Sequence, residues 1–172
     1  MANVEEVLAA MDEPGEDTRV ILTIDENLRI VTVPSVALVI GAKGDRYVNR
    51  IWFKINRNYR GTDLSDFEPK VYYTNAAGQR FFYTCTDITL EGECMLFSWL
   101  VAGNAAVETG TVIFGVCMQR TVGGILLQEF NTTTAEMRCL QSACDGDAEN
   151  DTPRKNDDMV LGNSFIGLMV LG

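Results

Sequence analysis

Three acidic side chains, Asp63, Asp66 and Glu68, are close enough in sequence to form a pair of catalytic carboxylates. Such a pair could hydrolyse a bond, with one carboxyl as the acid and the other as the base. They fall in a predicted loop, however, where acidic residues are typical of a solvated surface, and we favour that interpretation. The chain has no histidine, so Ser-His-Asp and Cys-His catalysis are excluded. We therefore expect no enzyme, no catalytic residue and no cofactor.

Metal sites are also not expected. Residues 145–151 (D-G-D-A-E-N-D) are rich in oxygen ligands but lack the ligand spacing of an EF-hand, so a solvated linker is favoured over a calcium loop. The glycines at 41–44 lack the spacing of a phosphate loop. No C-x-x-C motif is present and the cysteine count is odd, so we predict free thiols and no structural disulfide. The five cysteines are Cys85, Cys94, Cys117, Cys139 and Cys144.

The aromatic residues allow two interpretations, a sugar-binding platform or a hydrophobic core. They are Trp52, Phe53, Tyr72, Tyr73, Phe81, Phe82, Tyr83, Phe97 and Trp99. Most of them fall in predicted strands, which favours the core. Trp99 stands in the apolar run at 95–100 (M-L-F-S-W-L), and we predict that it is buried between two sheets. Two glycosylation sequons, at Asn131 and Asn150, carry little weight because no secretion signal precedes them.

The elements that must hold these residues are short strands separated by turn signals, with no alternation of strands and helices. This pattern predicts an all-β, antiparallel sandwich over residues 19–142. The strands are predicted at 20–24, 28–33, 36–40, 47–55, 70–74, 80–84, 87–90, 94–101, 111–119, 125–130 and 133–140. A loop is predicted at 57–67, and Gly123-Gly124 is a predicted hairpin turn.

Both ends of the chain differ from this body. Residues 1–18 are predicted to be a short amphipathic helix, with Val4, Val7, Leu8 and Met11 on one side, followed by an acidic linker. Residues 143–158 read as a second acidic linker, and residues 159–172 as an apolar tail without a charge. The net charge of −10 is concentrated in these flanks, which argues against nucleic acid as a partner. No apolar run has the length of a membrane span.

Seven short motifs occur in an order that resembles a known family. They are T-I-D at 23–25, R-I-V-T-V-P at 29–34, V-N-R-I-W-F-K at 48–54, G-T-D-L-S at 61–65, Y-Y-T-N-A-A-G at 72–78, F-S-W-L-V at 97–101 and E-F-N-T-T at 129–133. Together they resemble the N-terminal domain of phage baseplate upper proteins and similar immunoglobulin-like modules of phage virions. The resemblance covers about residues 20–140. It implies a β-sandwich that docks onto a phage particle and carries another module, although no large receptor-binding domain follows here.

Three hypotheses follow, in order of preference. The first is a structural virion protein of a tailed bacteriophage, an adaptor or decoration module on the baseplate or head surface, with a head-fibre anchor included. It would be made in the host cytoplasm and would bind other virion proteins, and its own copies, through the two termini. The second is a carbohydrate-binding module for host cell-surface glycan. The third is a hydrolase that uses the paired acids.

Overall fold

The computed structural model describes residues 18–153. The predicted N-terminal helix and the apolar tail at 159–172 lie outside the described residues. Within the part that is described, the regular structure is β-strand with three short 3-10 helices, so the all-β prediction is confirmed. Residues 143–153, taken by themselves, are exposed and contain neither strand nor helix.

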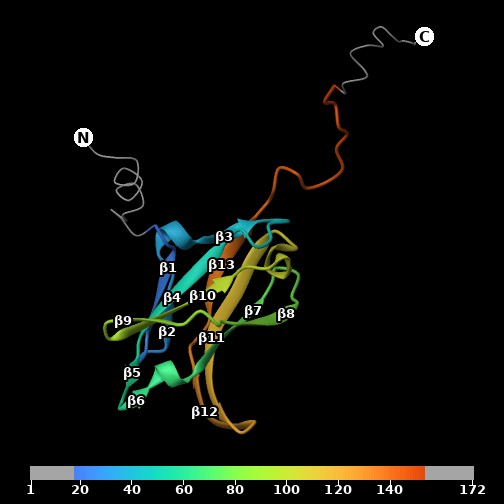
Figure 1. Ribbon diagram of the computed structural model, residues 1–172. Helices are drawn as coiled ribbons and strands as arrows, with labels where there is room; N and C mark the ends of the chain where they lie inside the picture. Colours follow the sequence, from blue (N-terminus) through green and yellow to red (C-terminus); the bar gives the residue numbers. More distant parts are fainter. Residues whose placement is uncertain (1–17, 154–172) are drawn as a thin grey trace, which may run out of the picture. The chain divides into compact units, whose positions relative to one another are not determined.

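Two sheets make up the body (Figure 1). The first has the order β2 (Ile30–Thr32), β1 (Ile21–Asp25), β4 (Arg50–Asn56), β10 (Cys94–Leu100) and β9 (Thr89–Glu91). The second has the order β3 (Val39–Ala42), β13 (Ala135–Leu140), β11 (Gly110–Val122), β7 (Glu68–Thr74) and β8 (Arg80–Thr84), with β12 (Ile125–Asn131) also paired to β11. The 3-10 helices are η1 (Ser35–Ala37), η2 (Leu64–Asp66) and η3 (Gly103–Ala106).

The prediction of a purely antiparallel arrangement is wrong at two places. β1 pairs in parallel with β4, and β3 pairs in parallel with β13. The reason is the path of the chain between β1 and β4, which runs through β2 and then crosses to β3 in the second sheet before it returns beside β1. A parallel pair needs such a crossover, whereas an antiparallel pair can be joined by a short turn.

The loop predicted at 57–67 is also more ordered than expected. It contains a small hairpin, β5 (Asn58–Tyr59) with β6 (Thr62–Asp63), followed by η2. Side chains of the loop itself fix these turns: Asn56 Oδ1 accepts a bond from the Asn58 amide at 2.9 Å, and Asp63 caps η2. Hydrogen bonds of this kind, from side chains to nearby backbone groups, can order a short polar segment. Such a segment has no alternating apolar residues from which its strands could be predicted.

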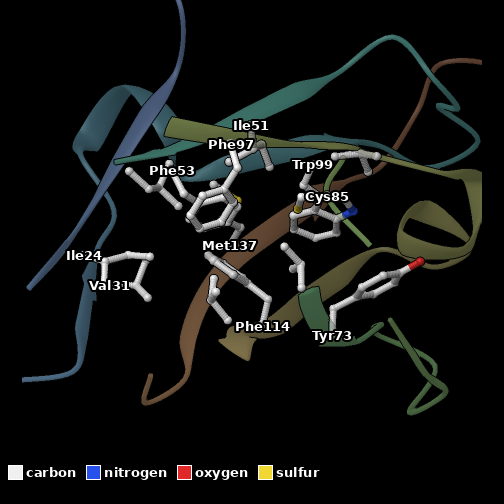
Figure 2. Packing of buried hydrophobic residues seen from close by; sticks show 14 of the residues in the cluster. Ile24, Val31, Ile51, Phe53, Tyr73, Cys85, Phe97, Trp99, Phe114 and Met137 are labelled. Carbon is white, nitrogen blue, oxygen red and sulfur yellow. The ribbon is translucent and has the colours of Figure 1, made fainter. Parts of the chain in front are cut away.

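The core lies between the two sheets, where inward-pointing side chains of both sheets meet (Figure 2). Phe53 of β4 stacks on Phe97 of β10, with ring centres 5.4 Å apart, and meets the edge of Phe114 from β11 of the other sheet. Trp99 is fully buried. Its ring centre lies 5.0 Å from that of Tyr73 and 5.8 Å from that of Phe114, and both of these residues belong to the opposite sheet. The predicted position of Trp99 between the sheets is therefore confirmed.

A partly buried polar cluster completes the free edge of β10. β9 pairs only with the first part of that strand, as far as Leu96. Beyond it, the Asp87 carboxylate accepts a hydrogen bond from the Ser98 amide at 3.0 Å and another from the Ser98 hydroxyl. Arg50 donates to the same hydroxyl at 2.6 Å and lies 3.6 Å from Asp87. Asp87 thus replaces a missing strand and satisfies a buried backbone N–H.

Candidate assembly interface

The strongest candidate for a functional surface is a hairpin that extends past the body. β7 pairs with β11 as far as Gln119, and beyond that residue β11 pairs with β12 alone. Gly123 and Gly124 form the turn with φ of 59° and 80°, the positive values that a two-residue hairpin turn requires. The predicted turn is therefore confirmed, and Figure 1 shows the hairpin curling away at the β12 label. We refer to residues 120–128 as the arm.

Every residue of the arm is exposed, including four large aliphatic side chains. Their exposed fractions are 53% for Val122, 66% for Ile125, 50% for Leu126 and 55% for Leu127. Val122 pairs with Ile125 and Thr121 pairs with Leu126, so these two pairs point to opposite faces of the hairpin. The arm therefore presents apolar groups on both faces.

The arm cannot derive its order from its own side chains. An isolated two-stranded hairpin is marginal in water, and a sheet normally buries at least one face. Apolar side chains that gather on one exposed element are typical of an interaction surface.

Arg29 fixes the base of the arm. Its guanidinium lies 4.0 Å from the centre of the Phe130 ring and 4.8 Å from that of Tyr59. It also donates to the Asn131 carbonyl and to the Tyr59 hydroxyl, both at 2.9 Å. The bond from Arg29 lowers the pKa of Tyr59, since a cation beside the hydroxyl favours the phenolate. The sequence did not single out Arg29, which is predicted to lie inside a strand.

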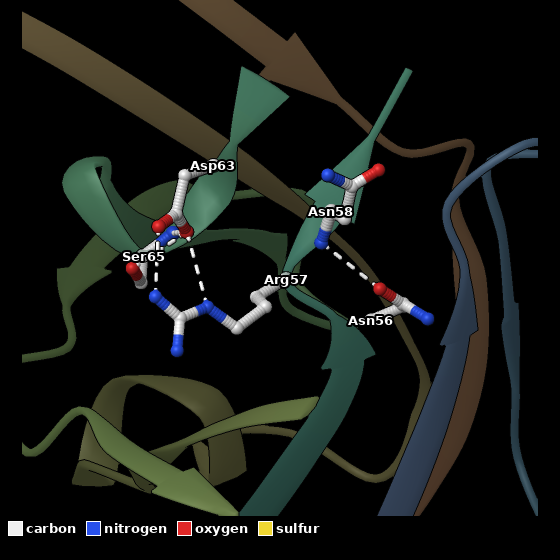
Figure 3. A network of polar contacts seen from close by, with 5 residues as sticks. All are labelled: Asn56, Arg57, Asn58, Asp63 and Ser65. Carbon is white, nitrogen blue, oxygen red and sulfur yellow. Dashed lines mark hydrogen bonds and ion pairs between the residues drawn. The ribbon is translucent and has the colours of Figure 1, made fainter. Parts of the chain in front are cut away.

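The three acids considered for catalysis lie in and beside the 3-10 helix η2, partly or fully exposed. Arg57 donates to both carboxylate oxygens of Asp63, at 3.3 and 2.8 Å, and Ser65 donates to Asp63 through its amide and its hydroxyl (Figure 3). These bonds, that from Arg57 above all, hold the pKa of Asp63 well below its usual range. Asp66 and Glu68 are exposed, and Glu68 lies 3.9 Å from Lys70. All three acids therefore lie at the surface, and two of them take part in ion pairs.

The aromatic residues divide into two groups. Phe53, Tyr73, Phe97 and Trp99 are in the core, as favoured from the sequence. Tyr72 and Phe82 instead stack on each other on the outer face of the second sheet, with ring centres 5.2 Å apart. Alternation along the strands explains the division, because Tyr73 points inward and its neighbour must point outward.

The other sequence candidates are placed as follows. Gly41 and Ala42 end β3, and the Ala42 amide donates to the Asp45 carboxylate at 3.0 Å, so this turn is closed by its own side chains.

None of the five cysteines, all within residues 18–153, is in a disulfide. In the same residues, no three His, Cys, Asp or Glu side chains gather as a potential metal site. The described part of the chain also has no helix that is long and apolar enough to cross a membrane.

The described residues thus form two main sheets over a shared apolar core, and the arm extends from the second sheet with every residue exposed. Neither a protein-family model nor a curated protein matches the sequence. Among solved structures, the chain matches one described as the N-terminal domain of phage TP901-1 ORF48, with a TM-score of 0.46 and 12% identity. The match covers 72% of this chain and 98% of that one.

Proposed function

We propose that the chain is a structural protein of a tailed-bacteriophage virion. It would serve as an immunoglobulin-like adaptor or decoration module on the baseplate or the head surface, with a head-fibre anchor as one form of this role. Its partners would be other virion proteins and further copies of itself within the particle. The observation that carries the proposal is the arm, because its two apolar faces need a neighbouring subunit.

The size of the effect supports this use of the arm. Full burial of one Val, Leu or Ile side chain stabilises by about 1.5–3 kcal/mol. The arm holds four such side chains, each half exposed or more, so a neighbour that covers both faces would gain several kcal/mol from them. Binding also costs conformational entropy wherever a segment must become ordered, and a hairpin already held by backbone hydrogen bonds keeps that cost low.

The sequence supports a phage particle as the place of assembly. Seven short motifs together resemble the N-terminal domain of baseplate upper proteins, and they extend over most of the sandwich. Two of them meet at the base of the arm: Arg29 lies in the second motif and Phe130 in the last. The resemblance therefore includes the residues that position the arm.

Particles purified from cells infected with the source phage test the proposal. Mass spectrometry should find the protein in the particle fraction after a density gradient, and antibody labelling should locate it on the baseplate or the head. A protein that stays in the soluble fraction while intact particles band elsewhere would contradict a structural role.

The arm is tested by a variant with Ile125, Leu126 and Leu127 changed to serine. This variant should keep the melting temperature of the wild type, because substitutions of exposed residues change stability little. It should nevertheless fail to join particles assembled in its presence. A matched control changes Val36 and Val48, which are 84% and 73% exposed on another part of the body, to serine. If the control fails in the same way as the arm variant, general loss of apolar surface and not the arm explains the result.

A further inference from the structure

A groove of about 340 Å³ lies on the outer face of the second sheet. It crosses three strands, with Tyr72 of β7 on one side, Ile113 and Gln119 of β11 along the floor, and Glu129 and Asn131 of β12 on the other side. The core residues Tyr73, Phe114 and Val116 point the opposite way, so the groove is not part of the sandwich interior. It is also separate from the arm, which begins at Arg120.

Gly115 keeps the floor of the groove open. It stands directly opposite Tyr72 in the register of β7 and β11, so the tyrosine ring borders the space that a side chain would occupy. A Cβ at this position would lie 3.3 Å from the Thr133 carbonyl oxygen and 3.5 Å from the Thr132 hydroxyl. The segment between β12 and β13 therefore passes close over Gly115, where a side chain would crowd its backbone.

A connected set of polar side chains forms one wall. Lys70 Nζ donates to Gln119 Oε1 at 3.0 Å, and Gln119 Nε2 donates to Glu129 Oε1 at 2.8 Å. Asn131 Nδ2 donates to the other oxygen of Glu129 at 3.0 Å. The bonds from Asn131 and Gln119 lower the pKa of Glu129, so its carboxylate is ionised and both amides are held in one orientation. Exposed charge networks contribute little to stability, so this order is better explained by binding.

An aromatic surface forms the facing wall. The rings of Tyr72 and Phe82 stack with an angle of 27° between their planes. The Arg80 guanidinium lies 5.8 Å from the centre of the Tyr72 ring, and Lys70 Nζ lies 5.5 Å from that of Phe82. A cation over each ring of the pair favours a defined ring orientation. The groove thus combines a flat apolar surface with fixed donors and acceptors.

We propose that this groove binds a neutral oligosaccharide. A pyranose ring has an apolar face that stacks on an aromatic ring and a rim of hydroxyl groups that need both donors and acceptors. Tyr72 supplies the first, and Glu129, Asn131 and Arg80 supply the second. The Glu129 carboxylate is balanced by Arg80 across the groove and by Lys70, which is linked to Glu129 through Gln119, so the groove does not favour a strongly charged ligand. A polyanion such as nucleic acid or a polyphosphate would meet the ionised Glu129 carboxylate.

Binding of the purified, full-length protein to an array of neutral and acidic bacterial-surface oligosaccharides tests the proposal. Saturation-transfer NMR with the best neutral oligosaccharide then measures affinity for the wild type and for Tyr72→Ala and Glu129→Ala. Both substitutions are on the outer face, so the melting temperature should change little. We expect binding to a neutral glycan, and at least a tenfold loss of affinity in each variant.

Trp52→Ala is the matched control. Trp52 is a half-buried aromatic on the outer face of the first sheet with Arg19 over its ring at 5.0 Å, and its loss should leave glycan binding unchanged. Three results would overturn the proposal: no binding to any oligosaccharide of the array, selection of acidic glycans alone, or equal loss in the Trp52 and Tyr72 variants. These measurements use no particles, so their outcome is independent of the proposed virion role.

Discussion

The Arg29 guanidinium stands 4.0 Å above the Phe130 ring and so ties the first sheet to the base of the arm. Arg29 lies in the turn between β1 and β2, whereas Phe130 belongs to β12 of the second sheet. The backbone strengthens the contact, because the Arg29 carbonyl accepts bonds from the Thr133 amide at 2.7 Å and from its hydroxyl at 2.9 Å. The arm is therefore rooted in both sheets, although only β12 and β11 form it.

Arg29→Ala should lower stability by about 1–3 kcal/mol, because it removes a cation–π contact and two hydrogen bonds from a charged donor. It should also raise the pKa of Tyr59 towards the value of an ordinary tyrosine, since the Arg29 bond is the main cause that lowers it. Denaturant unfolding and a spectroscopic titration of tyrosine measure the two effects.

Arg60→Ala is the matched control for this prediction. Arg60 lies over the same Tyr59 ring at 5.3 Å, and its φ of 49° resembles the 63° of Arg29, so both substitutions place alanine in the same backbone region. Arg60 makes a smaller contribution to the lowered pKa of Tyr59 than Arg29 does. Equal effects of the two substitutions would show that backbone conformation, and not the contact with Phe130, is responsible.

The strands that the sequence predicts well are those with a strong local signal. β8, β10 and the hairpin turn at Gly123-Gly124 fall where alternation and glycine place them. The parallel pairs and the extension of β11 to Val122 could not be predicted, since strand pairing depends on which distant strand supplies the partner. The groove was missed for the same reason: Tyr72, Gln119 and Glu129 are far apart in sequence and meet only through strand register.

Trp99→Ala should cost about 3–5 kcal/mol, the range for removal of a large aromatic side chain from a core. Trp99→Phe should cost clearly less, since it keeps an aromatic ring beside Tyr73 and Phe114. Trp99→Phe also removes the indole N–H. That group is buried without a hydrogen-bond partner, so its loss relieves a desolvation cost. Denaturant unfolding followed by circular dichroism compares the two variants. A cost below about 1 kcal/mol for the alanine variant would contradict burial of the indole.

Asp63 should make stability depend on acid pH. Its pKa is lower in the folded chain than the value near 4 of an unfolded aspartate, because Arg57 and Ser65 bond its carboxylate. The carboxylate therefore stabilises the fold above that unfolded value, and the contribution is lost as pH falls below it. The melting temperatures of wild type and Asp63→Asn should differ at pH 6, and the difference should shrink steadily as pH falls from 4 to 2. Asp66→Asn, on the same turn, is the control, and a gap that does not shrink with acid would exclude this linkage.

The thiols should react in an order set by burial. Burial is the main cause that raises the pKa of Cys85 to about 12 and that of Cys117 to about 11, so little thiolate is present at pH 8. Cys144 is exposed and should be alkylated first in the native protein. After unfolding without reductant, mass spectrometry should find all five cysteines alkylated. A dominant crosslinked peptide would instead demonstrate a disulfide.

The final prediction concerns residues 159–172, which are expected to bind a neighbouring subunit. Nine of these fourteen residues are Met, Val, Leu, Ile or Phe, and none is charged. Addition of this segment as a strand to a neighbouring sheet would cover both its side chains and its backbone groups. The acidic linker at 143–158 gives the segment a reach that folding back onto its own body would not need. Deletion of 159–172 should therefore leave the melting temperature of the monomer unchanged and prevent assembly.

A variant that replaces 159–172 with a serine-rich segment of equal length is the control for chain length, and it should behave like the deletion. The melting temperature of the monomer decides whether the segment binds a neighbouring subunit or packs on its own body. A segment packed on its own body would bury several side chains at about 1.5–3 kcal/mol each. Its loss would lower the melting temperature by roughly 2–4 °C for each kcal/mol. A drop of that size in the monomer, measured by calorimetry at low concentration, would place the segment in its own sandwich and contradict its use between subunits.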